Sequence, residues 1–106
     1  MTWMLVSPNN RPLGRGGTSY PSTDDCRAAV RRLRERHTGA TSTVSVMEGN
    51  QQWAWRVQLD GATVATSTRT YLRQRECSYN LHRFLAALPA AALDESVRVI
   101  GSGARR

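Results

Sequence analysis

Residues 53–67 read WAWRVQLDGATVATS, and this stretch predicts a β-hairpin. Apolar and polar side chains alternate on either side of Asp60 and Gly61, as they do in two strands that each turn one face toward a core. Asp-Gly is also the preferred pair for the two-residue turn that joins antiparallel strands. The stretch therefore predicts two neighbouring strands and the turn between them.

The predicted turn assigns the side chains of the hairpin to two faces. With Asp60 and Gly61 in the turn, Val57 is expected opposite Val64, because paired residues share a face. The face that we expect helices to cover then carries Trp53, Trp55, Val57, Leu59, Val64 and Thr66. The opposite face carries Ala54, Arg56, Ala65 and Ser67.

The first half of the chain matches the second half at a constant offset. Matched pairs include Met4 with Trp55, Val6 with Val57, Tyr20 with Tyr71, Cys26 with Cys77, and Leu33 with Phe84. So many matches in a short chain indicate a duplicated unit. In the first copy Asn9 and Asn10 take the place of the Asp-Gly turn, since asparagine tolerates the left-handed backbone that such a turn needs.

A stretch with helical spacing follows each hairpin. Residues 22–37 predict the first helix, because Cys26, Val30 and Leu33 recur at three- and four-residue intervals and Ser22 suits the N-cap. Residues 73–88 predict the second helix, which Pro89 ends. Its N-cap is weaker, since an arginine stands where the first helix has serine. Each copy ends in a short β-prone run, at 43–47 and 96–100.

This order of elements resembles the YegP-like family, small bacterial proteins made of tandem repeats. The resemblance rests on WAWRV at 53–57, the Asp-Gly turn, VATS at 64–67, Tyr71 and the cysteine-bearing helix. It covers nearly the whole chain and is strongest over 53–88. The family has no settled biochemical activity, so the resemblance leaves the function open.

The resemblance implies a single α+β domain over residues 1–101. Two tandem β-β-(β)-α-β repeats, at about 2–49 and 53–101, would form one antiparallel-rich sheet with two helices on one face. Pseudo-twofold symmetry and exchange of the last strands are implied as well. Residues 102–106 are expected to form a flexible basic tail.

The chain has 106 residues, which suits one domain. No apolar run is long enough to cross a bilayer, and residues 1–6 lack the features of a secretion signal. We therefore expect a cytoplasmic protein that makes no membrane contact and whose two cysteines are reduced.

The formal net charge is +7, and all fifteen positions counted as lysine or arginine are arginine. Five of them follow the first predicted helix: Arg27, Arg31, Arg32, Arg34 and Arg36. The first, second and fourth share one side of the helix. Such a row suits phosphate groups or a carboxylate-rich surface. A solvated basic face, with arginine favoured by high-GC coding, is the alternative.

A second candidate surface lies on the sheet face that the helices are expected to leave open. Trp3 and Leu5, above Gly14 and Gly16 and beside Arg56, would form an apolar platform there. It would serve self-association or a protein partner. Packing by the rest of the chain is one alternative, and stacking of single-stranded nucleic acid on Trp3 is another.

Catalytic residues, a metal site and a cofactor are not expected. Cys26 and Cys77 lie on the apolar stripes of the helices, where buried packing cysteines are typical. His37 and His82 stand at no metal-ligand spacing from a cysteine. The sequence therefore predicts a non-enzymatic interaction module, as a homodimer or a subunit of a larger assembly. The alternative is a nucleic-acid-associated protein that binds phosphates through the arginine row.

Overall fold

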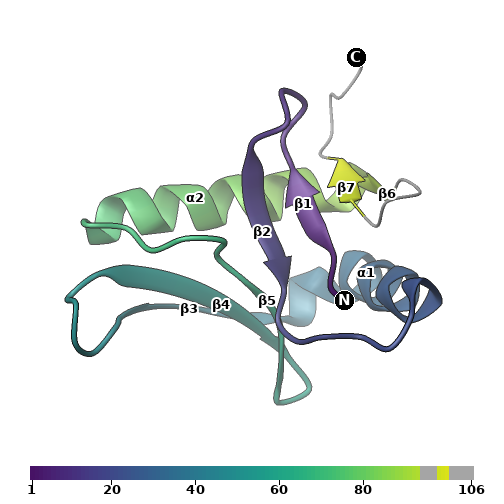
Figure 1. The fold of residues 1–106 in the computed structure, drawn as a ribbon, viewed down its shortest axis with the longest axis horizontal. Helices are drawn as coiled ribbons and strands as arrows, with labels where there is room; N and C mark the ends of the chain where they lie inside the picture. Colours follow the sequence, from purple (N-terminus) through teal and green to yellow (C-terminus); the bar gives the residue numbers. More distant parts are fainter. Residues whose placement is uncertain (94–97, 101–106) are drawn as a thin grey trace.

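The computed structural model describes residues 1–93 and 98–100 and shows an α+β fold (Figure 1). Five strands form an antiparallel sheet in the order β3-β4-β5-β2-β1. β7 extends this sheet parallel to β1, and β6 pairs with β7. The strands are β1 (Met4–Val6), β2 (Pro12–Gly16), β3 (Thr41–Val46), β4 (Trp53–Leu59), β5 (Ala62–Thr66), β6 (Ala92–Leu93) and β7 (Arg98–Ile100).

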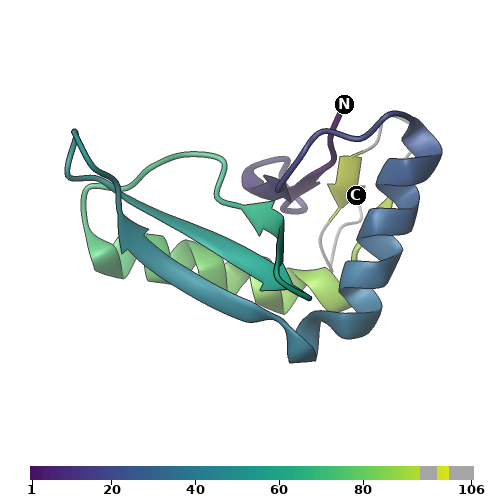
Figure 2. The same ribbon diagram turned by 90° about the horizontal axis from the view of Figure 1, so that it is seen from below.

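Two helices pack against the sheet where the spacing predicts them. They are α1 (Thr23–Arg36) and α2 (Gln74–Ala87), and each continues into a short 3₁₀ turn, η1 (His37–Gly39) or η2 (Leu88–Ala90). Ser22 caps α1, because its hydroxyl accepts the N–H of Asp25 at 3.1 Å. Arg73 makes no such bond at the start of α2, so the weaker cap is confirmed. Figure 2 shows α2 along the β3–β4 hairpin and α1 at the other end of the molecule.

The turn between β4 and β5 is confirmed. Asp60 and Gly61 have φ angles of 54° and 82°, the left-handed values that a tight hairpin turn requires. Leu59 pairs with Ala62 directly beside the turn. The Asp-Gly pair therefore sets the local backbone as expected.

The first hairpin also turns at the predicted asparagines. Asn10 has a φ of 68°. Ser7 closes the loop, since its N–H donates to the Arg11 carbonyl at 2.8 Å and its hydroxyl accepts the Arg11 N–H at 3.1 Å. The same hydroxyl donates to Asn9 Oδ1 at 2.6 Å, so this buried serine has its hydrogen bonds satisfied.

The register of β5 differs from the prediction by one residue. Val57 pairs with Ala65 and not with Val64, because the pairing shifts next to Val57 as in a β-bulge. A one-residue shift moves side chains to the other face. Ala65 and Ser67 are therefore buried, and the prediction that placed them on the open face is wrong. Thr66 takes the open face instead and pairs with Arg56.

The predicted platform of Trp3 and Leu5 is also wrong. Trp3 is 1% exposed and Leu5 is 0% exposed, and both belong to the core. Leu5 pairs with Gly14, and the ring of Phe84 occupies the space in front of that glycine. This face of β1 and β2 is therefore covered by α2, since glycine lets the ring approach the backbone. Of the predicted interface, Arg56 alone stays exposed.

Aromatic rings form the centre of the core. Phe84 of α2 contacts Trp3 and Trp55, with ring centroids 6.3 Å and 4.8 Å away. The same cluster contains Val30 and Leu33 of α1, so both helices share one core with the sheet. Cys26 and Cys77 are free thiols with no exposed surface, which confirms their predicted place in the core.

Strands from the two halves of the chain lie side by side at three places in the sheet, one of which is the antiparallel pairing of β2 with β5. β3 pairs with β4 in antiparallel fashion, whereas β1 pairs with β7 in parallel. The strand predicted at 43–47 is β3, and β7 covers 98–100 of the strand predicted at 96–100. The remainder of that prediction and the predicted tail at 102–106 lie outside the described residues.

Candidate functional site

Part of the predicted arginine row is used within the chain. The row lies on α1 and contains Arg27, Arg31, Arg32, Arg34 and Arg36. Arg32 and Arg36 both donate to the carboxylate of Asp60 in the β4–β5 turn. Arg36 does so with both terminal nitrogens, at 2.6 Å and 3.1 Å. These contacts tie α1 to the hairpin and neutralise part of the row.

The other three arginines of the row differ in their contacts and in their exposure. Arg34 donates Nη2 to the carbonyl of Pro89 at 3.4 Å. Arg27 is half-buried and Arg31 is exposed. Neither forms an ion pair with a residue that the structure describes. The structure therefore does not present the five guanidinium groups as one free surface.

The ion pairs of Asp60 make stability depend on pH. The hydrogen bond from Arg36 outweighs desolvation and holds the pKa of Asp60 below its ordinary value of 3.8. Such a carboxyl stabilises the fold above its unfolded-state pKa, and this contribution is lost as pH falls through the folded-state pKa. We expect Asp60→Asn to lower the melting temperature at about pH 7 and to lower it by less at about pH 2.

Thermal unfolding of both proteins, followed by circular dichroism across that pH range, measures this difference. Asparagine tolerates the positive φ of position 60, so the substitution removes the charge and keeps the turn. The effect is small, because solvent screens ion pairs between exposed side chains. An equal difference at both pH values would show that the turn geometry, and not the ion pair, is responsible.

A wide concavity, here called the α2 groove, lies between α2, the start of β2 and the segment that enters α2. Its volume is about 810 Å³. It is lined by Arg11, Pro12, Leu13, Thr68, Arg69, Tyr71, Arg75, Glu76, Tyr79, Asn80 and Arg83. Arg75, Tyr79 and Arg83 are four residues apart, so α2 presents them as a single row.

The α2 groove is strongly basic. Its four arginines, all exposed, are Arg11, Arg69, Arg75 and Arg83. The groove has a single acidic side chain, Glu76, which pairs with Arg73 at 3.3 Å. Within the described part of the chain, none of the four arginines has an ion-pair partner. Their charges are thus available to a ligand, unlike those of Arg32 and Arg36.

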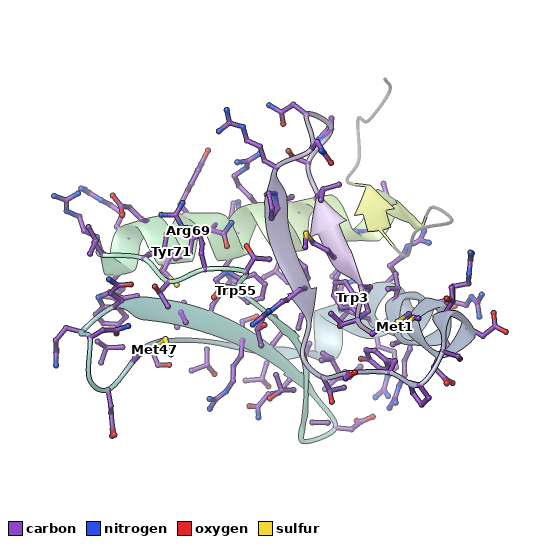
Figure 3. All side chains as sticks on the ribbon, viewed as in Figure 1. Met1, Trp3, Met47, Trp55, Arg69 and Tyr71 are labelled. Atoms are coloured by element: carbon purple, nitrogen blue, oxygen red, sulfur yellow. The ribbon has the colours of Figure 1, made fainter. Side chains whose placement is uncertain are left out.

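Two tyrosines give the groove flat apolar surface. Tyr71 is held in place by backbone hydrogen bonds to Trp53 at 2.6 Å and 2.8 Å. The guanidinium of Arg69 lies 4.9 Å from the centroid of the Tyr71 ring (Figure 3). Burial raises the pKa of Tyr71 and outweighs the opposing charge of Arg69, so its hydroxyl is protonated at neutral pH and can donate. Tyr79 is 65% exposed.

Asn80 connects the groove to the core. Its Oδ1 accepts the indole N–H of Trp55 at 2.6 Å, and the residue is only 9% exposed. That bond fixes the orientation of the amide, because only one of its two ends can accept. The amide nitrogen is therefore directed away from Trp55, in a side chain that lines the groove.

A second, smaller concavity lies on the open face of the sheet. It has a volume of about 430 Å³, and Arg15, Arg56 and Arg69 are among its lining residues. Thr66 lies between the first two and accepts the Arg15 Nε–H at 3.4 Å. Arg56 was predicted at an apolar platform, but it belongs to this polar and basic surface.

The spacing of residues on α2 is a signal for the α2 groove that can be found in the sequence. Arg75, Tyr79 and Arg83 recur at four-residue intervals, a spacing that places two cations and an aromatic ring on one helix face. Arg11 and Arg69 carry no such signal. They reach the groove only because β2 and the segment before α2 fold beside that helix face.

Both described cysteines lie in surroundings that do not favour thiol reactivity. Burial raises the pKa of both Cys26 and Cys77, which disfavours the reactive thiolate. No three histidine, cysteine or acidic side chains among the described residues come together as metal ligands.

Searches of protein-family models, curated proteins and solved structures found no match for this chain. The resemblance to the YegP-like family stays a prediction. Among the described residues, no helix is long and apolar enough to span a bilayer.

Proposed function

We propose that this protein is a small, non-enzymatic, cytoplasmic binding module whose partner is single-stranded nucleic acid. The observation that carries the proposal is the α2 groove, in which four arginines without an ion pair among the described residues surround two tyrosines. The groove replaces the α1 row as the main phosphate-binding surface. Arg27 and Arg31 do not line this groove.

Phosphate and base recognition both suit this groove. Arginine offers a planar fork of donors that matches a phosphate, and the groove supplies four of them. A base can stack on an exposed aromatic ring such as Tyr79, and such stacking contributes about 1–3 kcal/mol per base. An acidic polypeptide would pair with the arginines but would not stack on the Tyr79 ring. The exposed aromatic surface therefore favours nucleic acid.

Fluorescence anisotropy with labelled oligothymidylate of about 12 nucleotides tests the proposal. Binding should weaken steeply between about 50 mM and about 200 mM salt, because each neutralised phosphate releases counterions. We expect Arg75→Gln/Arg83→Gln to weaken binding at least about tenfold and to reduce the salt slope by about 1 per lost contact. Tyr79→Ala should weaken it by about tenfold through lost stacking.

The matched control is Arg27→Gln/Arg31→Gln, which removes the same charge from α1 and should bind nearly as the unmodified protein does. An equal loss of binding in this control would mean that the α1 row, and not the groove, contacts the phosphates. No binding at low salt would reject the proposal. Displacement by polyglutamate as effective as by oligothymidylate would point to an acidic protein partner instead.

One observation favours a protein partner as the second candidate. β3 forms one edge of the sheet, so one side of its backbone is available for pairing with another strand. Val46 and Met47 at its end are 45% and 43% exposed. A homodimer or a heterologous complex would use this edge. A dimer mass in light scattering that persists at high salt, without bound nucleic acid, would favour this candidate.

The duplicated architecture is part of the same proposal. Two repeats at 2–49 and 53–101, as in the YegP-like family, would explain why the last strand of one half pairs with the first strand of the other. The neighbours β3–β4 and β1–β7 support that exchange. The opposite directions of these two pairings are a departure from strict pseudo-twofold symmetry.

A further inference from the structure

The α2 groove is continuous with the concavity on the open face of the sheet. Thr68 and Arg69 line both of them, so this pair forms the ridge between the two surfaces. A third concavity, of about 380 Å³, shares Arg15 and Thr66 with the open face and reaches Met1. The three concavities therefore adjoin one another in the fold, although many of their lining residues are far apart in the sequence.

The strand register brings the arginines of the open face into one line. Arg56 on β4 pairs with Thr66 on β5, and Thr66 pairs with Arg15 on β2. Paired residues point to the same face, and neighbouring strands are about 4.8 Å apart. Arg56 and Arg15, two strands apart, thus stand about 10 Å from each other across the sheet. Both are exposed.

No carboxylate interrupts this surface within the described residues. The linings of the open-face concavity and of the third hollow contain no aspartate or glutamate. The N-terminal ammonium of Met1, at the far end, donates to the Ser19 hydroxyl and the Tyr20 carbonyl, each at 3.0 Å. Positive charge thus continues from the groove to the start of the chain.

We infer that a bound single strand leaves the α2 groove over Thr68 and Arg69 and continues across the open face along Arg56 and Arg15. This second contact region rests on the proposed function of the groove and extends it. It sets the length of nucleic acid that the protein can use: a short strand fills the groove, and a longer strand gains the arginines of the sheet. Arg69 is the junction that both lengths contact.

Binding of two oligothymidylates, of about 4 and about 12 nucleotides, tests the inference. The variant Arg15→Gln/Arg56→Gln should bind the longer strand at least about tenfold more weakly and the shorter strand as the unmodified protein does. Arg75→Gln/Arg83→Gln should weaken binding of both. Arg27→Gln/Arg31→Gln is again the charge-matched control and should weaken neither.

The outcomes separate the two proposals. If Arg15→Gln/Arg56→Gln binds the longer strand normally while the groove variant does not, the continuation across the sheet is wrong and the groove function stands. If the unmodified protein binds neither strand, the function itself is wrong.

A second measurement avoids substitutions altogether. Amide chemical shifts of the unmodified protein, followed by NMR, should change at Arg15 and Arg56 with the longer strand only. Shifts at Arg69 and Arg83 should change with both strands. Unchanged shifts at Arg15 and Arg56 with the longer strand would overturn the inference.

Discussion

Replacement of Phe84 by alanine is expected to lower the free energy of unfolding by about 3–5 kcal/mol, the largest stability effect that we predict. Phe84 has no exposed surface, and its ring contacts those of Trp3 and Trp55. Truncation would remove contacts to both rings and leave a cavity between α2 and the sheet. Proteins of this size are stable by about 5–15 kcal/mol, so the variant should lose a substantial part of its stability.

Urea denaturation measures this change, with tryptophan fluorescence as the signal. The matched control is Tyr79→Ala, which truncates an aromatic residue on the exposed side of the same helix. It should change stability by no more than about 0.5 kcal/mol. A similar loss in both variants would mean that truncation of any aromatic side chain on α2, and not loss of core packing at Phe84, explains the effect. A loss below about 1 kcal/mol for Phe84→Ala would contradict its central place in the core.

Substitution of Gly14 by alanine is expected to cost about 1–3 kcal/mol or more through overpacking. A Cβ atom at this position would lie 2.5 Å from Cδ1 of Phe84 and 2.7 Å from Cη2 of Trp55. Neither ring can move away easily, because both are packed in the core. The backbone of β2 would have to shift, and with it the pairing to Leu5.

Gly39→Ala is the matched control, since a Cβ atom there meets nothing within 4 Å. Its φ is not in the left-handed range, so alanine should be neutral or stabilise by about 0.4–1 kcal/mol. Urea denaturation of the two variants compares them directly. If Gly14→Ala is as stable as Gly39→Ala, α2 does not pack against β2 as described. The double variant Gly14→Ala/Phe84→Leu should lose less than the sum of its single changes, because they share one contact.

Much of the fold follows from local signals in the sequence. The Asp-Gly turn at 60 and 61, the N-cap at Ser22 and the helical spacing each depend on residues close together in the chain. Such interactions form whatever the rest of the molecule does, so they are predictable from a short window. The burial of Cys26 and Cys77 is predictable for a related reason. Each lies on the apolar stripe of its helix, and that stripe packs toward the sheet.

The assignment of faces failed where the strand pairing is irregular. Strict alternation from the turn places Ala65 and Ser67 on the open face, but the register shift beside Val57 moves them into the core. Trp3 was misplaced in the same manner, as alternation does not reveal which face of β1 a distant helix covers. A bulge is set by packing on both sides of the sheet, and a window of sequence does not contain that information.

The candidate site, too, is predictable from the sequence only in part. The cationic side chains of α2 are evident from their spacing, but the α1 row was the more conspicuous pattern. Asp60 decides between the two, since it pairs with Arg32 and Arg36 only when the β4–β5 turn reaches α1. That contact joins residues far apart in the chain, and only the folded molecule brings them together.

The sequence by itself determined the turns, the helices and their caps, because each depends on local geometry. The tertiary structure decided which face each strand buries, which arginines are paired within the chain and which stay exposed around the α2 groove. The physical reason is distance along the chain. Local backbone preferences act over a few residues, whereas packing of Phe84 on Gly14 and ion pairing of Arg36 with Asp60 need the whole fold.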